Sequence, residues 1–430
     1  MNFTSNNDIF IKPFINAFGK CNKPKINKET TSQFNTILIS LYQDIYEANT
    51  YVFKNVCFKH RTINLHTNKQ DAILPEINNG KYYPKHIKDY ITTNEKYQLI
   101  FTCKNIGNRE INIIFTLFSE KELQNINVYL NRVKMMYMWL HICSKYSDKN
   151  CSQSLSIHIY LTPFIKKLPT ESTTIIGPAQ VNTAFTYACL PKGLMMIFRE
   201  EEWFKVFLHE TFHSYGLDFA NHEDKHLKDT LKKIFPINSE FSIYEAYTET
   251  WGRIINCAFS SFNTLENKKD KNTFLQNMKF CLELERMFAM YQCNKILGFM
   301  GLKYENLHKN NNGDGDGDGD GDGETNKYLR KNLYREDTHV FAYYVMTSIF
   351  LNDHPRFLVW CKNHNKVLLQ FDRSSENFKA FAEYIKQIYK CDSYKNGINY
   401  MTSLIENIKK NSKNKQLLLN STRMSIVDMV

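Results

Sequence analysis

The chain has 430 residues, of which 55 are basic and 44 acidic, and its formal net charge is +11. Hydrophobic residues make up 43% and aromatic residues 14%, which excludes a disordered chain and supplies material for a packed interior. Because one hydrophobic core rarely organises so long a chain, we expect two or three subdomains. The basic residues are scattered, apart from a run at 407–415 that we interpret as a solvated face, so binding to nucleic acid is not indicated.

The eleven cysteines are dispersed and none forms a CxxC pair. In a chain of this length, that pattern favours free thiols in a reducing compartment over a disulfide framework. The first residues lack the basic and apolar regions of a signal peptide, and no apolar run is long enough to span a membrane. We therefore expect a soluble, intracellular, cytoplasmic protein, and the sequence does not indicate its oligomeric state.

The first part of the chain, 1–105, reads as an N-terminal α+β region of short strands and helices without a motif. The stretches 96–105 and 109–118 alternate between apolar and polar residues, as neighbouring strands do. Ser119 and Glu122 form a capping-box pattern at the start of one long amphipathic helix.

Three further strands are predicted at 155–163, 181–190 and 193–199. The three glutamates at 200–202 suit the first turn of a helix, where the helix dipole favours negative charge. That helix contains the stretch "WFKVFLHETFHSYGLDF", residues 203–219.

From about residue 221 the chain is predicted to be mainly helical, so its fold class is α+β. The alternating Gly-Asp repeat at 310–324 cannot bury surface and lacks the spacing of calcium-binding loops, so we interpret it as a flexible linker. Helical periodicity is present in 238–262, 272–300, 338–351 and 374–389. The predicted division of the chain is 1–105, 106–220, 221–309, the linker 310–324, and 325–430.

The HExxH motif of residues 209–213 can build a metal site. Positions i and i+4 share one helix face, so His209 and His213 can direct their imidazoles at one metal ion. Glu210 lies about 100° further round the helix, beside the metal position, where a base can take a proton from water. The alternative is a helix with two partly buried histidines that only make hydrogen bonds.

A catalytic zinc ion needs a third protein ligand. The stretch from His209 to Gly216 also fits HExxHxxG and resembles the start of the metzincin pattern, but Phe219 stands where metzincins carry their third ligand. Asp218 is one residue short of that position, and we expect it to be a surface residue after the helix end.

The stretch "SIYEAYTETWG", residues 242–252, resembles the glutamate helix of thermolysin-like gluzincins. The resemblance implies that Glu245 is the zinc ligand and that Glu249 orients a zinc-bound histidine from behind. Ser242 and Glu245 also fit a capping box, and in that case Glu249 would be the ligand. The matching residues are Glu245, Ala246, Thr248, Glu249, Trp251 and Gly252.

The same resemblance implies a zincin-like catalytic domain, with a mixed sheet and an active-site helix, followed by a mainly α-helical C-terminal subdomain. It also implies a Zn²⁺ cofactor and a polypeptide substrate. The family's tyrosine and histidine that stabilise the transition state would come from 337–346, which offers His339, Tyr343 and Tyr344. Its substrate-binding edge strand would contain Asn182 and Ala184.

The sequence therefore predicts a zinc metallopeptidase in which Glu210 is the general base. The alternatives are an inactive zinc-binding or structural (virion or scaffold) protein of zincin fold, a protein without metal, and a nucleic-acid binder. The chain is also similar to uncharacterised HExxH proteins of large DNA viruses, which would place it in host cytoplasm or in a virion. Cys21 could in principle block the zinc as a thiolate, but we expect an inert thiol.

Overall fold

The computed structural model of the chain describes residues 5–76, 81–222, 224–309 and 323–428. Within these ranges, six strands form one mixed sheet in the spatial order β1-β2-β3-β4-β6-β5. The first three strands are antiparallel, β3, β4 and β6 are parallel, and β5 returns antiparallel at the edge. The strands are β1 His60–Asn64, β2 Tyr97–Ile106, β3 Arg109–Leu117, β4 Ser154–Ile159, β5 Ala184–Thr186 and β6 Lys192–Ile197.

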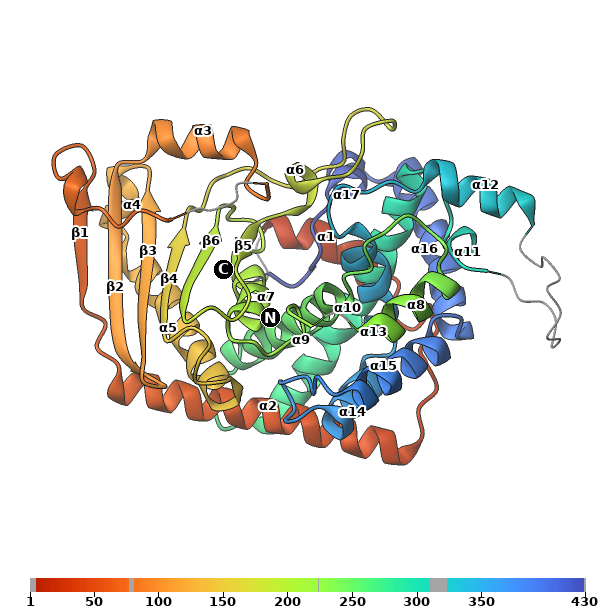
Figure 1. Cartoon of the computed structure of the whole chain (residues 1–430), viewed down its shortest axis with the longest axis horizontal. Helices are drawn as coiled ribbons and strands as arrows, with labels where there is room; N and C mark the ends of the chain where they lie inside the picture. Colours follow the sequence, from red (N-terminus) through yellow and green to blue (C-terminus); the bar gives the residue numbers. More distant parts are fainter. Residues whose placement is uncertain (1–4, 77–80, 223, 310–322, 429–430) are drawn as a thin grey trace.

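The sheet lies at one side of the molecule and most of the later helices lie at the other, while the long helix α2 runs beneath both (Figure 1). The helices of the first half are α1 Ser5–Ile15, α2 Lys28–Asn55, η1 Lys69–Asp71, α3 Lys85–Asn94, α4 Glu120–Gln124, α5 Ile126–Tyr146 and α6 Pro178–Val181.

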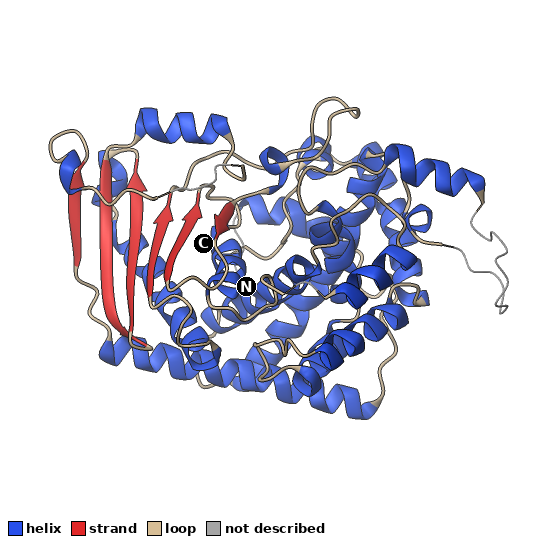
Figure 2. Cartoon of the chain, in the orientation of Figure 1, coloured by secondary structure: helices blue, strands red, loops and turns tan. Residues whose placement is uncertain are grey.

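From Trp203 onward every named element in the described ranges is a helix, as Figure 2 shows by colour. The predicted α+β class, with a mainly helical second half, is therefore confirmed. These helices are α7 Trp203–Ser214, α8 Lys225–Ile234, α9 Ile243–Asn263, α10 Lys271–Phe299, α11 Tyr304–Leu307, α12 Glu324–Leu333, η2 Phe341–Met346, α13 Thr347–Asn352, α14 His354–His364, α15 Ser375–Ile388, α16 Asp392–Asn411 and α17 Lys415–Asn420.

The two strands predicted at 96–105 and 109–118 form a hairpin, as expected. Ile106 pairs with Arg109, so Gly107 and Asn108 form a two-residue turn, and both have positive φ (59° and 56°). Such turns match the twist of the flanking strands and favour glycine and asparagine. A Cβ on Gly107 would also lie 2.4 Å from Cβ of Ser144, so this position requires glycine for space as well.

Three local predictions need correction. The helix expected from Ser119 is two helices, α4 and α5, which meet at Asn125. The strand expected at 181–190 is the shorter β5, because α6 occupies the chain up to Val181. The glutamates at 200–202 precede α7, and Glu202 is its N-cap residue with φ of 60°, so they do not form its first turn.

The cysteine prediction is wrong for one pair, because Cys151 and Cys189 form a disulfide. Other cysteines, for example Cys21, Cys57 and Cys103, carry free thiols. Within the described residues, no helix has both the length and the apolar composition needed to cross a membrane. The basic run at 407–415 is largely exposed, as predicted.

One buried apolar cluster extends from Phe10 to Val427 and joins the sheet side to the helical side. The domain boundaries drawn from the sequence stay a prediction. Residues 310–322 of the predicted linker lie outside the described residues, and α12 begins directly after Gly323.

Candidate metal centre

The site lies where α7 packs against the start of α9. Every residue of α7 is buried, so the two histidines of the HExxH motif face protein and the cleft. Ser242 is the N-cap residue of α9, but its side chain makes no capping hydrogen bond. The carboxylate of Glu245, in the first turn of α9, is instead directed at both imidazoles. The capping interpretation of Glu245 is therefore wrong.

Three ligand atoms form a small triangle. His209 Nε2 lies 3.1 Å from His213 Nε2 and 3.1 Å from Glu245 Oε2, and His213 Nε2 lies 3.3 Å from the same oxygen. These three buried residues are the group that could hold a metal ion among the described residues. The structure thus brings together the three residues predicted as metal ligands.

The triangle has the dimensions of a tetrahedral metal site. Zinc binds imidazole nitrogen and carboxylate oxygen at about 2.0–2.2 Å in tetrahedral geometry, so two such ligand atoms lie about 3.3 Å apart. The observed edges of 3.1 to 3.3 Å agree with this separation. Two imidazole nitrogens that face each other also need a proton or a cation between them, because each directs a lone pair at the other. This donor set fits zinc.

Each imidazole is held from behind by a carboxylate. Nδ1 of His209 lies 3.1 Å from Oε2 of Glu249, and Nδ1 of His213 lies 2.5 Å from Oδ2 of Asp218. If each Nδ1–H donates to its carboxylate, both Nε2 lone pairs point toward the metal position. Glu249 therefore lies where the resemblance placed it, behind a histidine. The expectation for Asp218 is wrong, because Asp218 is only 1% exposed and contacts the site.

The carboxylate of Glu249 is itself balanced by buried cations. Nζ of Lys205 lies 3.0 Å from both carboxylate oxygens, and Nε of Arg253 donates to Oε1 at 2.9 Å. Burial would raise the pKa of Glu249, but Lys205 and Arg253 hold it well below its usual value. Glu249 is thus an anion at neutral pH.

The electrostatics of the site favour a cation. Burial would lower the pKa of both imidazoles, yet Glu245 and Glu249 raise the pKa of His209, and Asp218 and Glu245 raise that of His213 well above its ordinary value. The same contacts hold the pKa of Glu245 well below its ordinary value, against the effect of burial. Because Lys205 and Arg253 offset the charge of Glu249, the negative charge that favours a cation beside the two imidazoles comes from Glu245 and Asp218.

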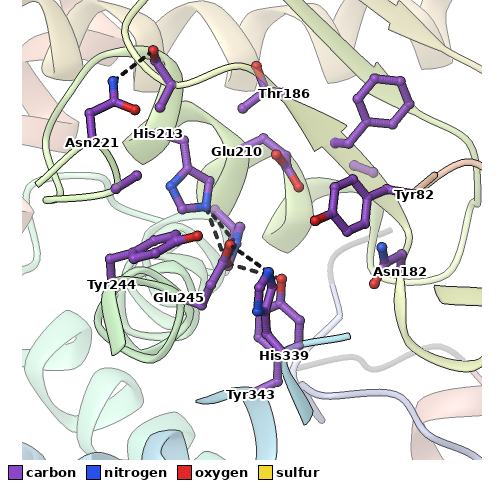
Figure 3. Close-up of a pocket in the computed structure, with 15 residues that line it drawn as sticks. Tyr82, Asn182, Thr186, Glu210, His213, Asn221, Tyr244, Glu245, His339 and Tyr343 are labelled. Carbon is purple, nitrogen blue, oxygen red and sulfur yellow. Dashed lines mark hydrogen bonds and ion pairs between the residues drawn. The ribbon is translucent and has the colours of Figure 1, made fainter. Parts of the chain in front are cut away.

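A cleft of about 210 Å³ opens onto these ligands. Glu210 lines it, and burial raises the pKa of this carboxyl above its ordinary value. Figure 3 shows Glu210 and Tyr82 pointing toward the middle of the cleft, with Tyr343 and His339 on the side of Glu245. The predicted base therefore shares one cavity with the predicted metal ligands.

The predicted transition-state donors are beside the ligands. The hydroxyl of Tyr343 donates to Oε2 of Glu245 at 3.0 Å, and Nε2 of His339 lies 3.9 Å from Oε1. Tyr343 is on η2, one turn of π-helix, a distortion that often marks functional sites. Tyr344 points elsewhere, because its hydroxyl donates to the carbonyl of Thr422.

The opposite wall of the cleft is the edge of the sheet. Asn182, Ala184 and Thr186 line it, from β5 and the residue pair before it. Among the described strands β5 pairs only with β6, so one of its edges carries no strand, and its residues line the cleft. A free strand edge can align an extended peptide by backbone hydrogen bonds.

Sequence reasoning missed several residues of the site. Lys205 precedes His209 by four residues and Arg253 follows Glu249 by four, so helical spacing could have indicated both. Tyr82 comes from a distant loop, and no local pattern indicates it. Cys21 is buried against Arg286, which donates to its backbone carbonyl at 3.1 Å, and lies outside the cleft lining.

Comparison of the chain with protein-family models, with curated proteins and with solved structures gave no match. The case for a function therefore depends on the geometry of the cleft.

Proposed function

We propose that this chain is a zinc-dependent metallopeptidase with a zincin-like catalytic domain, similar to the gluzincins. The observation that supports the proposal best is the triangle of His209, His213 and Glu245, with the carboxylate of Glu210 in the same cleft. An ordinary helix with two buried histidines would also have an acceptor for each ring, but it would not need both Nε2 atoms directed at each other and at one carboxylate of another helix.

His209, His213 and Glu245 would hold the ion. Zinc, when bound, lowers the pKa of a coordinated water to about 7 and polarises a carbonyl group. Glu249 and Asp218 hold the two imidazoles in the orientation that binding needs. Lys205 and Arg253 keep Glu249 charged, so that it accepts from His209 and does not compete for a proton.

Glu210 is the general base in this proposal. It takes a proton from the attacking water and passes it to the leaving amine as the peptide bond breaks. Tyr343, on the side of Glu245, and His339 are the groups that can donate to the oxygen on which charge develops.

The substrate is a polypeptide laid along the free edge of β5. Asn182 lies beside the start of this strand, and Glu210 and the metal ligands lie across the cleft from it. In this arrangement the backbone of the substrate pairs with the strand, and the scissile carbonyl faces the ligands.

The test is a pair of variants assayed for bound zinc and for cleavage of a broad peptide library. Glu210→Gln keeps the shape of the side chain, so we expect it to bind zinc as the unmodified protein does while hydrolysis falls by at least about 100-fold. His213→Ala should lose both zinc and activity. If Glu210→Gln cleaves peptides normally, the mechanism is wrong. If the unmodified protein binds zinc and cleaves nothing, an inactive zinc-binding protein is the better interpretation.

A further inference from the structure

A second, much smaller cavity of about 30 Å³ adjoins the cleft beside Glu210. His209, Glu210 and Asn182 line both spaces, so the two lie side by side. Its remaining walls come from residues beyond the cleft, including Val206, Thr183 and Met424. One water molecule needs about 10–15 Å³ of such space, so the cavity holds about two water molecules and has room for one small group, such as a methyl or a hydroxymethyl.

The walls of this small cavity are fixed by buried ion pairs. Lys205 is paired with Glu249, and Lys166 lies 2.5 Å from a carboxylate oxygen of Glu202. All four side chains are almost fully buried. Separating a buried pair leaves an uncompensated charge and costs several kcal/mol. The cavity therefore cannot widen at these walls to admit a larger group.

Met424 closes the cavity from a distant part of the chain, residues 421–428. The backbone N–H of Met424 donates to both carboxylate oxygens of Glu202, at 3.0 and 3.1 Å, and that of Ser425 donates to one of them at 2.5 Å. The sulfur of Met424 lies 3.9 Å from Nζ of Lys205. Because Glu202 is the N-cap residue of α7, Met424 is fixed relative to the helix that carries the HExxH motif.

One polar atom of the cavity lining is unpaired. The hydroxyl of Thr183 is buried and has no hydrogen-bond partner among the described residues. Leaving a buried hydroxyl without a partner costs about 1–3 kcal/mol. Because this oxygen is enclosed by protein, a group in the cavity does not contact it, and the size of the cavity is what selects the group.

We propose that this cavity receives the side chain of one residue next to the scissile bond, and that Met424 restricts it to glycine, alanine or serine. This inference depends on the proposed peptidase function and specifies its substrate class. The side chain would enter beside Glu210, whose carboxylate must be next to the reacting carbonyl. Met424 is then a specificity-determining residue.

The experiment uses the full chain loaded with zinc and peptides in which both residues flanking one bond vary among glycine, alanine, serine, leucine and phenylalanine. At one of the two positions, we expect kcat/KM for the small residues to exceed that for leucine by at least about 10-fold, because even one excess methylene in a tight pocket costs about that much. Met424→Ala should raise kcat/KM for leucine at that position by roughly 10-fold.

Two further variants keep the test decisive. Met401→Ala removes an equally buried methionine that lines neither cavity, so its substrate preference should be unchanged. Thr183→Val keeps the shape of the side chain and removes a hydroxyl that a group in the cavity does not contact, so its substrate preference should also be unchanged. Zinc content and thermal unfolding of each variant show whether it is folded.

The outcomes separate the two proposals. Efficient cleavage with leucine or phenylalanine at both flanking positions would overturn the size restriction and leave the peptidase function intact. An unchanged preference in folded Met424→Ala, or in Met424→Val if Met424→Ala does not fold, would do the same. If the zinc-loaded protein cleaves none of the peptides, both proposals are overturned.

Discussion

The two histidines of the candidate metal centre present the same nitrogen to the same point but are held in different ways. Behind His209, Glu249 belongs to a buried ionic network with Lys205 and Arg253. Behind His213, Asp218 has a neutral neighbour, the hydroxyl of Thr248 at 3.4 Å, and its backbone carbonyl accepts from Arg373. Glu249 is thus part of a buried ionic network, whereas Asp218 is positioned by the backbone turn after α7.

This difference separates stability from metal binding. Removing the acceptor of His209 leaves buried cations without their partner, so both the stability of the fold and the affinity for the metal should fall. Removing the charge of Asp218, the acceptor of His213, leaves the backbone contacts of Asp218 in place. The affinity for the metal should therefore fall while the stability of the fold is kept. The following variants test this contrast.

Glu249→Ala should have the largest effect. It removes the carboxylate that contacts Lys205 through both oxygens, and truncating one partner of a buried pair costs about 3–5 kcal/mol. Chemical denaturation would measure the loss. The control is Glu406→Ala, which breaks an exposed pair with Lys409 and should leave the stability nearly unchanged. Equal losses for the two variants would contradict a structural role for the ionic network.

Loss of the disulfide between Cys151 and Cys189 should have the second-largest effect on stability, and this effect should be local to the end of α7 that carries His213. The backbone N–H of Cys189 donates to the carbonyl of His213 at 3.0 Å, and a Cβ on Gly216 would lie 2.9 Å from the sulfur of Cys151. The disulfide thus packs against the end of α7. Because it closes a separation of 38 residues, its loss should cost about 2–4 kcal/mol.

The measurement is thermal unfolding of Cys189→Ser beside Cys57→Ser, which changes an exposed free thiol and should have no effect. Amide hydrogen exchange should also quicken at residue 189 in the first variant. Unchanged stability and exchange in Cys189→Ser would show that the disulfide does not support this end of the helix.

Asp218→Asn should have the smallest effect on the fold and a clear effect on the metal. The amide keeps the shape of the side chain but loses the charge that accepts from His213, and substitutions of such acceptors weaken metal binding by about 10–100-fold. Competition with a zinc chelator would measure the affinity, and the melting temperature of the metal-free protein should be nearly unchanged. Zinc affinity equal to that of the unmodified protein would exclude a positioning role for Asp218.

The sequence predicted what depends on local spacing. The HExxH pair lies on one helix, and the face of α9 that carries Glu245 and Glu249 follows from the same helical period. The α+β class and the four later helical stretches follow from apolar periodicity. These features need no knowledge of how distant segments meet.

The features that were missed depend on tertiary contacts. Asp218 looked like a surface residue because the glycine of HExxHxxG indicates a turn, but the sequence does not show that this turn, with φ of 61° at Gly216, places Asp218 behind His213. The disulfide joins two cysteines 38 residues apart, and Met424 is more than 200 residues from the Glu202 carboxylate that holds it. Sequence spacing carries no information on such pairings.

A crystal structure with anomalous scattering recorded on both sides of the zinc absorption edge tests the central claim most directly. The account predicts one zinc ion, bound by Nε2 of His209, Nε2 of His213 and the carboxylate of Glu245, with Glu249 and Asp218 on the outer nitrogens of the rings. A protein without zinc at this position, or an ion bound by Glu249 or Asp218 in place of Glu245, would contradict it.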